Sequence, residues 1–403
     1  MRLFLFLAAQ LAVFNLIILC PEVRAQALGR SDTGRTINRS IDGALDSEVP
    51  KKSSSARMRS KFVLFVTDRS IDPSADQQGR NGKILRYERL LLNTLGRPVS
   101  YGFAEIGYPT TRKAGDTNYA PCSKEENPLK DFSIIDHQIV STPEAFQELI
   151  HRYYPTGSNT SLLFFHGLNN SFSDAAERLA QLVLDLDYVG LPVLFSWPSD
   201  AGRSDPCWPS SGIGATEYKK ASEMALASQP YAVHTMDLLA YALRPFEVLA
   251  HSMGADLATN SVIFRQSTKD EGFRPYDPTE AIAASPCSLV LAAPDISTKQ
   301  FNVERRPKII RRDRHVAVYC SNDRALQASQ ITNSSDERLG YCPMAKSPME
   351  GIDLVAVTGK IQDFFHHSYY LNSGKILEDI RHVLDCSDTP PNRAGGQREI
   401  RLP

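Results

Sequence analysis

The sequence lacks a surplus of charge of either sign, and it contains only one long hydrophobic run. Its 45 Lys and Arg residues balance 46 Asp and Glu residues, which leaves a formal net charge of −1. Proteins that bind nucleic acids usually carry a basic surplus to neutralise phosphates, so we expect no nucleic-acid partner. A hydrophobic fraction of 42% excludes wholesale disorder and collagen-like structure. The single apolar run excludes a polytopic membrane protein.

Signatures of metal and cofactor binding are also missing. No CxxC pair or Cys/His cluster has the spacing of a zinc site, and the adjacent His366 and His367 have no third ligand at a diagnostic spacing. Neither a Rossmann glycine fingerprint nor a P-loop is present. We therefore expect no bound metal and no organic cofactor.

The apolar run lies at the N-terminus, over residues 3–20. A positively charged start precedes it, and Ala25 and Ala27 follow it as small residues that a signal peptidase accepts. The run is at the low end of the ~20 apolar residues that span a bilayer. The sequence therefore predicts a cleaved signal peptide over residues 1–27 and a periplasmic or extracellular protein, with an uncleaved anchor as the alternative.

Cysteine usage is compatible with export. Cys20 falls in the predicted signal peptide, and an even number of cysteines remains in the exported chain. This indicates up to three disulfides, although the sequence does not determine the pairing and some of these residues could equally be buried thiols. The remaining cysteines are Cys122, Cys207, Cys287, Cys320, Cys342 and Cys386.

Composition divides the rest of the chain into three parts. Residues 28–60 are polar and predict a disordered linker. Residues 61–386 alternate apolar β-runs with helical patterns, which predicts an α/β domain with a mostly parallel sheet flanked by helices and an N-terminal strand extension. Residues 387–403 predict a polar tail.

Within this domain, polar or small residues follow most of the expected strands, and ligands of open α/β sheets bind beyond the carboxyl ends of strands. The chemistry is therefore expected there. The segments 107–131 and 201–216 predict loops, the second of them mobile and over the site, while 200–235 and 265–285 are polar and irregular. The expected strands are 62–66, 99–106, 162–165, 193–195, 246–250, 288–292, 315–319 and 353–357, and the expected helices are 84–95, 179–186, 236–243 and 257–264.

A serine stands between an expected strand and an expected helix, in the sequence Ala250-His251-Ser252-Met253-Gly254. This approximates the G-x-S-x-G nucleophile elbow, in which a tight strand-to-helix turn presents the serine oxygen. Ala250 replaces the first glycine and adds only a methyl group. A serine that merely caps the following helix is the alternative interpretation.

Two further segments carry the partners that a nucleophilic serine needs. His166-Gly167-Leu168-Asn169 follows the strand 162–165, where the N–H of Leu168 would complete an oxyanion hole with the N–H of Met253. The order Ser252, Asp323, His367 supplies an acid and a base beyond the serine.

Several neighbouring residues have competing interpretations. Asp295 ends the strand after the nucleophile strand and is an alternative acid. His366 would point away from the face of His367 on an extended segment, and His251 is interpreted as packing behind the elbow. Trp197 is expected in a pocket wall or the core, and Asp68-Arg69 as a structural ion pair or cap.

The motifs together resemble an alpha/beta-hydrolase family of unknown function within the esterase/lipase superfamily. The resemblance implies an alpha/beta-hydrolase fold, with Ser252 as nucleophile, Asp323 as acid and His367 as base, and it leaves the substrate open. The matching segments, in chain order, are 65–69, 100–102, 165–172, 194–199, 249–254, 292–295, 321–326 and 367–369.

The sequence therefore predicts an exported serine hydrolase, of carboxylesterase or lipase type, that cleaves a small-molecule or lipid ester through an acyl-enzyme. A catalytically degenerate hydrolase used for binding, and a peptidase or amidase with the same triad, are the alternatives. Oligomeric state and transient contact with a membrane surface stay open.

Overall fold

A computed structural model describes most of the region expected to form the domain. The signal-peptide segment, the helix expected over 84–95 and residues 201–213 of the loop expected over 201–216 lie outside the described residues, as do Cys122, Cys207 and Cys386. The described residues are 46–48, 58–69, 99–119, 126–154, 160–199, 214–242, 245–267, 285–311, 313–332, 336–343, 349–361, 366–384 and 396–403.

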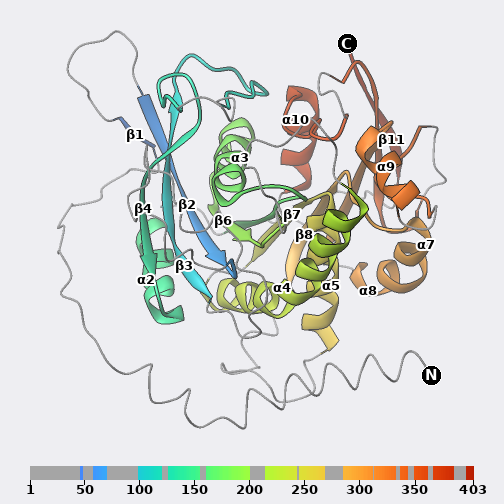
Figure 1. Ribbon diagram of the computed structural model, residues 1–403, viewed down its shortest axis with the longest axis horizontal. Helices are drawn as coiled ribbons and strands as arrows, with labels where there is room; N and C mark the ends of the chain where they lie inside the picture. The colour runs from blue at the N-terminus through green and yellow to red at the C-terminus, as the bar shows by residue number, and fades with distance from the viewer. Residues whose placement is uncertain are drawn as a thin grey trace. The chain divides into compact units, whose positions relative to one another are not determined.

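One sheet organises residues 44–403, which form one unit by their internal contacts (Figure 1). Its order is β11-β10-β9-β8-β7-β5-β6-β2-β3-β4, with β1 pairing to β2. The strands are β1 (Asp46–Glu48), β2 (Met58–Thr67), β3 (Ser100–Pro109), β4 (Ser133–Val140), β5 (Ser161–Phe165), β6 (Leu191–Ser196), β7 (Phe246–His251), β8 (Pro286–Ala292), β9 (His315–Ser321), β10 (Asp353–Gly359) and β11 (Gln397–Leu402).

From β2 to β11 all neighbouring strands are parallel, whereas β1, β3 and β4 attach by antiparallel pairing. The chain leaves β5 to form β6 on one side and returns to form β7 on the other. This reversal creates a topological switch point, and the crevice at the carboxyl ends of such strands is where open α/β sheets bind ligands.

Helices cover both faces of the sheet, and each face has its own hydrophobic core. One core contains side chains of α2, α4 and α5, and the other contains side chains of α3 and α10. The predicted α/β fold with a mostly parallel sheet is confirmed. The helical segments are α2 (Pro143–Tyr153), α3 (Phe172–Asp185), α4 (Ala215–Ala242), α5 (Met253–Ser267), α7 (Thr298–Gln300), a π-helical turn (Phe301–Arg305), α8 (Arg306–Ile309), α9 (Arg324–Thr332) and α10 (Gly374–Val383).

Capping hydrogen bonds explain where α3 begins. This helix follows the loop after β5. Ser171 is its N-cap and accepts a hydrogen bond from the N–H of Asp174 at 3.1 Å. The Asp174 carboxylate accepts from the N–H of Ser171 at 3.0 Å, which completes a capping box. Ser171 therefore caps the helix.

Both ends of the predicted domain need correction. The predicted linker 28–60 contains β1 and the first residues of β2, and the predicted polar tail contains β11, which pairs in parallel with β10. The exposed residues Gln397, Glu399 and Arg401 alternate along β11 with less exposed ones. An edge strand tolerates this polar pattern because only part of it is buried, so composition alone resembled a tail.

The helix expected at 236–243 is also longer than predicted. It is the end of α4, which begins at Ala215 and contains Pro230 in its interior. A proline in a helix removes a backbone donor and normally ends the helical pattern in a sequence. In α4 the packing against α2 and α5 retains the helix across this position. Among the described residues no helix is long and apolar enough to cross a membrane.

Candidate active site

Ser252 lies in a tight turn between β7 and α5. Its φ angle of +55° is in the left-handed region, which is uncommon for a residue with a side chain. The Ser252 N–H donates to the carbonyl of Ala292 at 3.0 Å, and the Ser252 carbonyl accepts from the N–H of Asp295 at 3.1 Å. Hydrogen bonds to the end of β8 therefore hold the turn in this conformation.

Close packing explains the small residues of the motif. A Cβ atom on Gly254 would lie 2.3 Å from the carbonyl oxygen of His166, so no side chain fits there. Ala250 is fully buried within β7, where its methyl group belongs to the hydrophobic core. The alanine in place of the first motif glycine is thus accommodated, whereas Gly254 is required for the approach of the His166 loop.

The structure brings Asp323 and His367 together. Asp323 follows β9, is fully buried, and its Oδ2 lies 2.6 Å from Nδ1 of His367. Its Oδ1 accepts from the N–H of Leu326 at 3.0 Å, in the first turn of α9. Both carboxylate oxygens therefore have partners, and one of them sets the orientation of the imidazole ring.

His366 has a different environment from its neighbour. Its φ angle is +57°, and its Nδ1 lies 3.2 Å from the carbonyl oxygen of Asn322. The Ser321 hydroxyl donates to the His366 carbonyl at 3.1 Å. Thus His367 is the histidine that contacts Asp323, and His366 contributes to holding the loop.

Asp295, the alternative acid, contacts other groups. Its carboxylate accepts hydrogen bonds from the hydroxyls of Tyr218 at 2.9 Å and Ser329 at 2.7 Å, and it lies 3.2 Å from Nε of Arg338. Burial raises the pKa of Asp295, while Arg338 and the two hydroxyls act in the opposite direction. These contacts place Asp295 in a buried polar cluster that ties α4 and α9 to the end of β8.

The loop after β5 packs directly against the serine turn. A Cβ on Gly167 would lie 3.1 Å from Cβ of Ser252. The Asn170 side chain donates to the carbonyls of Gly167 and Leu168, each at 3.0 Å. Because a trans peptide directs its C=O and N–H to opposite sides, the Leu168 N–H points away from Asn170. The Leu168 N–H therefore lies on the side of the loop opposite the Asn170 side chain.

Arg69 holds this loop through hydrogen bonds. The sequence did not indicate this role. The Arg69 guanidinium donates to the Asn170 carbonyl at 2.6 Å and to the Ser196 hydroxyl at 2.8 Å. The neighbouring Asp68 accepts from the Ser228 hydroxyl at 2.6 Å. Arg69 therefore joins the end of β2 to the loop after β5 and the end of β6.

His166 and Trp197 form the buried support of the same loop. Their rings stack with centroids 5.5 Å apart, and the indole N–H donates to the His166 carbonyl at 2.9 Å. Burial and the nearby Arg69 lower the pKa of His166 well below its usual value, so its ring is neutral. Both side chains are fully buried, which places Trp197 in the core.

Positive φ angles cluster around the site. Apart from Asp187 in the turn after α3, the non-glycine residues with positive φ in the described ranges lie in the loops just discussed or beside them. They are Asn169, Ser252, Ala293 and His366. Backbone strain of this kind collects where function requires an unusual geometry. No sequence signal marked Ala293, because alanine does not favour this conformation, whereas histidine, as at His366, is among the residue types that adopt it more often.

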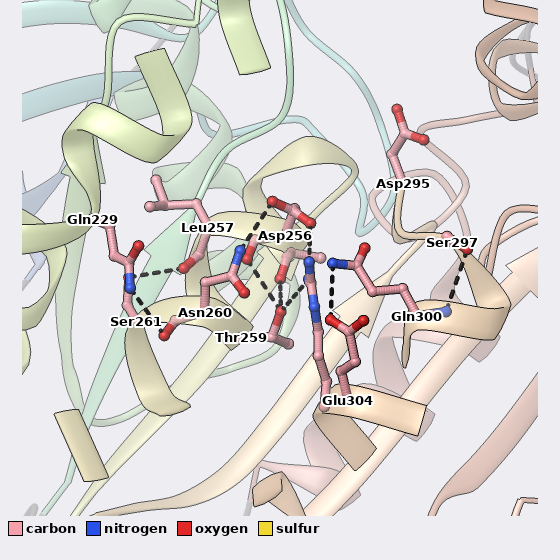
Figure 2. A network of polar contacts seen from close by, with 12 residues as sticks. Gln229, Asp256, Leu257, Thr259, Asn260, Ser261, Asp295, Ser297, Gln300 and Glu304 are labelled. Carbon is pink, nitrogen blue, oxygen red and sulfur yellow. Dashed lines mark hydrogen bonds and ion pairs between the residues drawn. The ribbon is translucent and has the colours of Figure 1, made fainter. Parts of the chain in front are cut away.

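A polar network braces the helix that begins after Ser252. The Arg305 guanidinium donates to Asp256 at 2.6 Å and to Thr259 at 2.9 Å, and both acceptors lie on α5. Figure 2 shows Asp256 and Thr259 facing the segment that contains Gln300 and Glu304. The π-helical turn that carries Arg305 therefore fixes α5 from the side of β8. No group of three or more potential metal ligands occurs in the described part of the chain.

Comparison with protein families gives one match. A family model described as alpha/beta hydrolase of unknown function (DUF900) matches residues 142–384, a range that contains Ser252, Asp295, Asp323 and His367. No curated protein matches the sequence.

Several solved esterases are similar to this chain at a low level. An esterase from Pyrobaculum calidifontis has 11% identity and a TM-score of 0.29, over 70% of this chain and 80% of that one. Carboxyl esterase 2 from the fungus Tuber melanosporum has 9% identity and a TM-score of 0.25, over 75% and 71%. An esterase from Pseudomonas putida ECU1011 has 11% identity and a TM-score of 0.24, over 75% and 68%. Likeness at this level does not extend to the substrate.

Proposed function

The chain belongs to the family of alpha/beta hydrolases of unknown function, and from this premise we propose that it is a serine hydrolase that cleaves carboxylic esters. The observation that carries the proposal is the contact between Asp323 and His367 beside the strained turn of Ser252. The ring of His367 lies 4.6 Å from that of His251, the residue that precedes the serine.

In the proposed reaction, His367 acts as the base. With Nδ1 held by Asp323, Nε2 is the nitrogen that accepts the proton of the Ser252 hydroxyl. The serine oxygen then forms a bond to the ester carbonyl carbon, and the carbonyl oxygen becomes an oxyanion. Asp323 keeps the required tautomer and stabilises the imidazolium that forms.

The oxyanion is stabilised by the N–H groups of Met253 and Leu168. Met253 is the first residue of α5, where N–H groups have no partner within the helix and the helix dipole favours negative charge. The Leu168 N–H comes from the loop that packs against Ser252. One missing donor of this kind typically costs about 100-fold in rate.

Collapse of the intermediate breaks the ester bond. His367 transfers its proton to the departing alcohol, and the acyl group remains on Ser252. Water then attacks the acyl-enzyme with His367 again as the base, which releases the carboxylic acid and restores the serine. No step requires a metal or an organic cofactor.

We propose a small-molecule or lipid ester as the substrate class, in the crevice at the β5/β7 switch point. The missing first glycine of the motif would favour a non-catalytic binding role. The accommodated methyl group of Ala250 removes that objection to catalysis. An amide substrate remains the alternative outcome of the experiment below, because the same triad cleaves both bonds.

Labelling with a fluorophosphonate tests the nucleophile. We expect the label on Ser252, and none on Ser252→Ala or His367→Ala. Ser261→Ala is a matched control, since this buried serine on α5, the helix after Ser252, donates to the Leu257 carbonyl at 2.8 Å; it should label normally. Labelling of Ser252→Ala at the wild-type rate contradicts the proposal. Rates on p-nitrophenyl esters and matched p-nitroanilides then separate an esterase from an amidase.

We also propose export through the N-terminal signal. Mass spectrometry of the mature protein should find its first residue after Ala25 or Ala27. A chain that retains residues 1–27 in the membrane fraction would support the anchor instead.

A further inference from the structure

His251 contacts both loops of the proposed machinery. It is the last residue of β7, and it points to the same face as Leu249, toward the core of α3 and α10. Its Nε2 lies 3.1 Å from the carbonyl oxygen of His367. On its other side, a Cβ on Gly167 would lie 2.7 Å from Nδ1 of His251. The His251 side chain therefore lies between the loop that contains His367 and the loop that contains Gly167.

The rings around His251 leave it little freedom to move. Its centroid lies 4.6 Å from that of His367 and 4.6 Å from that of Tyr370. His251 is only 5% exposed and Tyr370 is fully buried. Any displacement of His251 would therefore displace the peptide of His367.

The hydrogen bond to a carbonyl fixes the tautomer of His251. A carbonyl oxygen only accepts, so Nε2 of His251 must carry the proton. Burial, His367 and Arg178 lower the pKa of His251 well below its usual value. Burial also raises the pKa of Tyr370 to about 12. His251 and the Tyr370 ring that packs against it are therefore neutral at physiological pH.

Resting on the proposed function, we propose that His251 is a positioning residue: its Nε2–H holds the backbone of His367 and thereby sets the place of the base relative to Ser252. Its neutral ring also adds no second positive charge beside the His367 imidazolium that forms during the reaction. A like charge at this distance in a buried site would oppose that step.

Two substitutions separate the hydrogen bond from the shape of the ring. The amide nitrogen in His251→Gln reaches the position of Nε2 and retains a donor, whereas His251→Phe retains an aromatic ring and loses the donor. We expect kcat for a p-nitrophenyl ester to stay within about 3-fold in the glutamine variant and to fall by about 100-fold in the phenylalanine variant, with KM little changed. The acid limb of the pH profile should move only in the phenylalanine variant.

The opposite pattern, with His251→Phe active and His251→Gln impaired, overturns the proposal because packing alone would then matter. Wild-type rates in both variants also overturn it. Melting temperatures identify a variant that fails to fold.

A measurement on the wild-type protein does not depend on the variants. Histidine ¹⁵N NMR should show His251 as the Nε2–H tautomer with no titration across neutral pH, and an Nδ1–H tautomer overturns the proposal. If the wild-type protein is not labelled by a fluorophosphonate, the proposed function fails, while the tautomer still decides whether the hydrogen bond exists.

Discussion

At the scale of single residues, two buried aspartates near Ser252 have different partners. Asp323 contacts His367 and a backbone N–H, whereas Asp295 contacts Arg338, Tyr218 and Ser329. An acid that orients the base must reach its Nδ1, and Asp323 does so at 2.6 Å. The two carboxylates therefore predict different mutant phenotypes.

Asp323→Asn should lower kcat by roughly 10³- to 10⁴-fold, since the amide no longer maintains the tautomer of His367. Asp295→Asn is the matched change, and it should reduce kcat by less than about 10-fold while lowering the free energy of unfolding by about 2 kcal/mol. Ester turnover and urea denaturation of both variants measure this. A larger loss of kcat in Asp295→Asn would reverse the assignment of the acid.

The buried histidine next to the serine predicts a pH dependence of stability. The pKa of His251 is lowered in the folded state, so between that pKa and about 6.5 the unfolded chain binds a proton that the folded chain does not. Stability therefore rises with pH in this window and is lost as pH falls. His251→Gln should reduce the slope of unfolding free energy by up to about 1.4 kcal/mol per pH unit. Urea titrations near pH 5 and pH 6 measure the slope, with the exposed His382→Gln as control.

At the scale of elements, the site depends on strand ends and helix starts that approach closely. The switch point places the ends of β5 and β7 side by side, and α5 begins at the serine turn. Gly254 allows the His166 carbonyl to approach this helix. A side chain at Gly254 should therefore push the loop that contains His166 away from Ser252.

Gly254→Ala should destabilise the fold by about 1–3 kcal/mol, because the new Cβ would lie 2.3 Å from the His166 carbonyl. Ester turnover should fall as well. Gly374→Ala, at the start of α10, is the control, since nothing lies within 4 Å of its added Cβ. That variant should be neutral or slightly more stable. Equal melting temperatures for the two variants would show that the His166 carbonyl does not pack closely against Gly254.

At the scale of the whole molecule, a disulfide joins segments that the chain separates. Cys320 near the end of β9 is bonded to Cys342, at a sequence separation of 22 residues. The segment that carries Cys342 also forms backbone hydrogen bonds with Ser321 and with Pro294. The disulfide thus ties the segment of Cys342 to the end of β9, close to Asp323.

Replacing both cysteines, as Cys320→Ala and Cys342→Ala together, should lower the free energy of unfolding by about 3 kcal/mol through the loss of loop closure in the unfolded chain. Urea denaturation without reductant measures the change. Single variants should lose the same amount, because either one breaks the bond. Unchanged stability in the double variant would mean that this bond does not constrain the unfolded chain.

The class of fold and the strand-end motifs can be predicted from the sequence alone. Short apolar runs followed by polar residues identify parallel strands, and Ala250-His251-Ser252-Met253-Gly254 marks the turn that the structure contains. These signals are local, since each depends on neighbouring residues of one segment. For the same reason, the segments that carry the family resemblance can be recognised without knowledge of any contact between them.

Which distant groups meet depends on how the whole chain folds. The partner of His367, the pairing of Cys320, the anchoring role of Arg69 and the extent of α4 past Pro230 depend on contacts between remote segments. Contacts with other elements override the local preferences that pointed elsewhere, as where pairing with β10 makes an edge strand of the polar segment β11. Side-chain periodicity reports which face of a segment is buried, and it carries no information about the element that buries it.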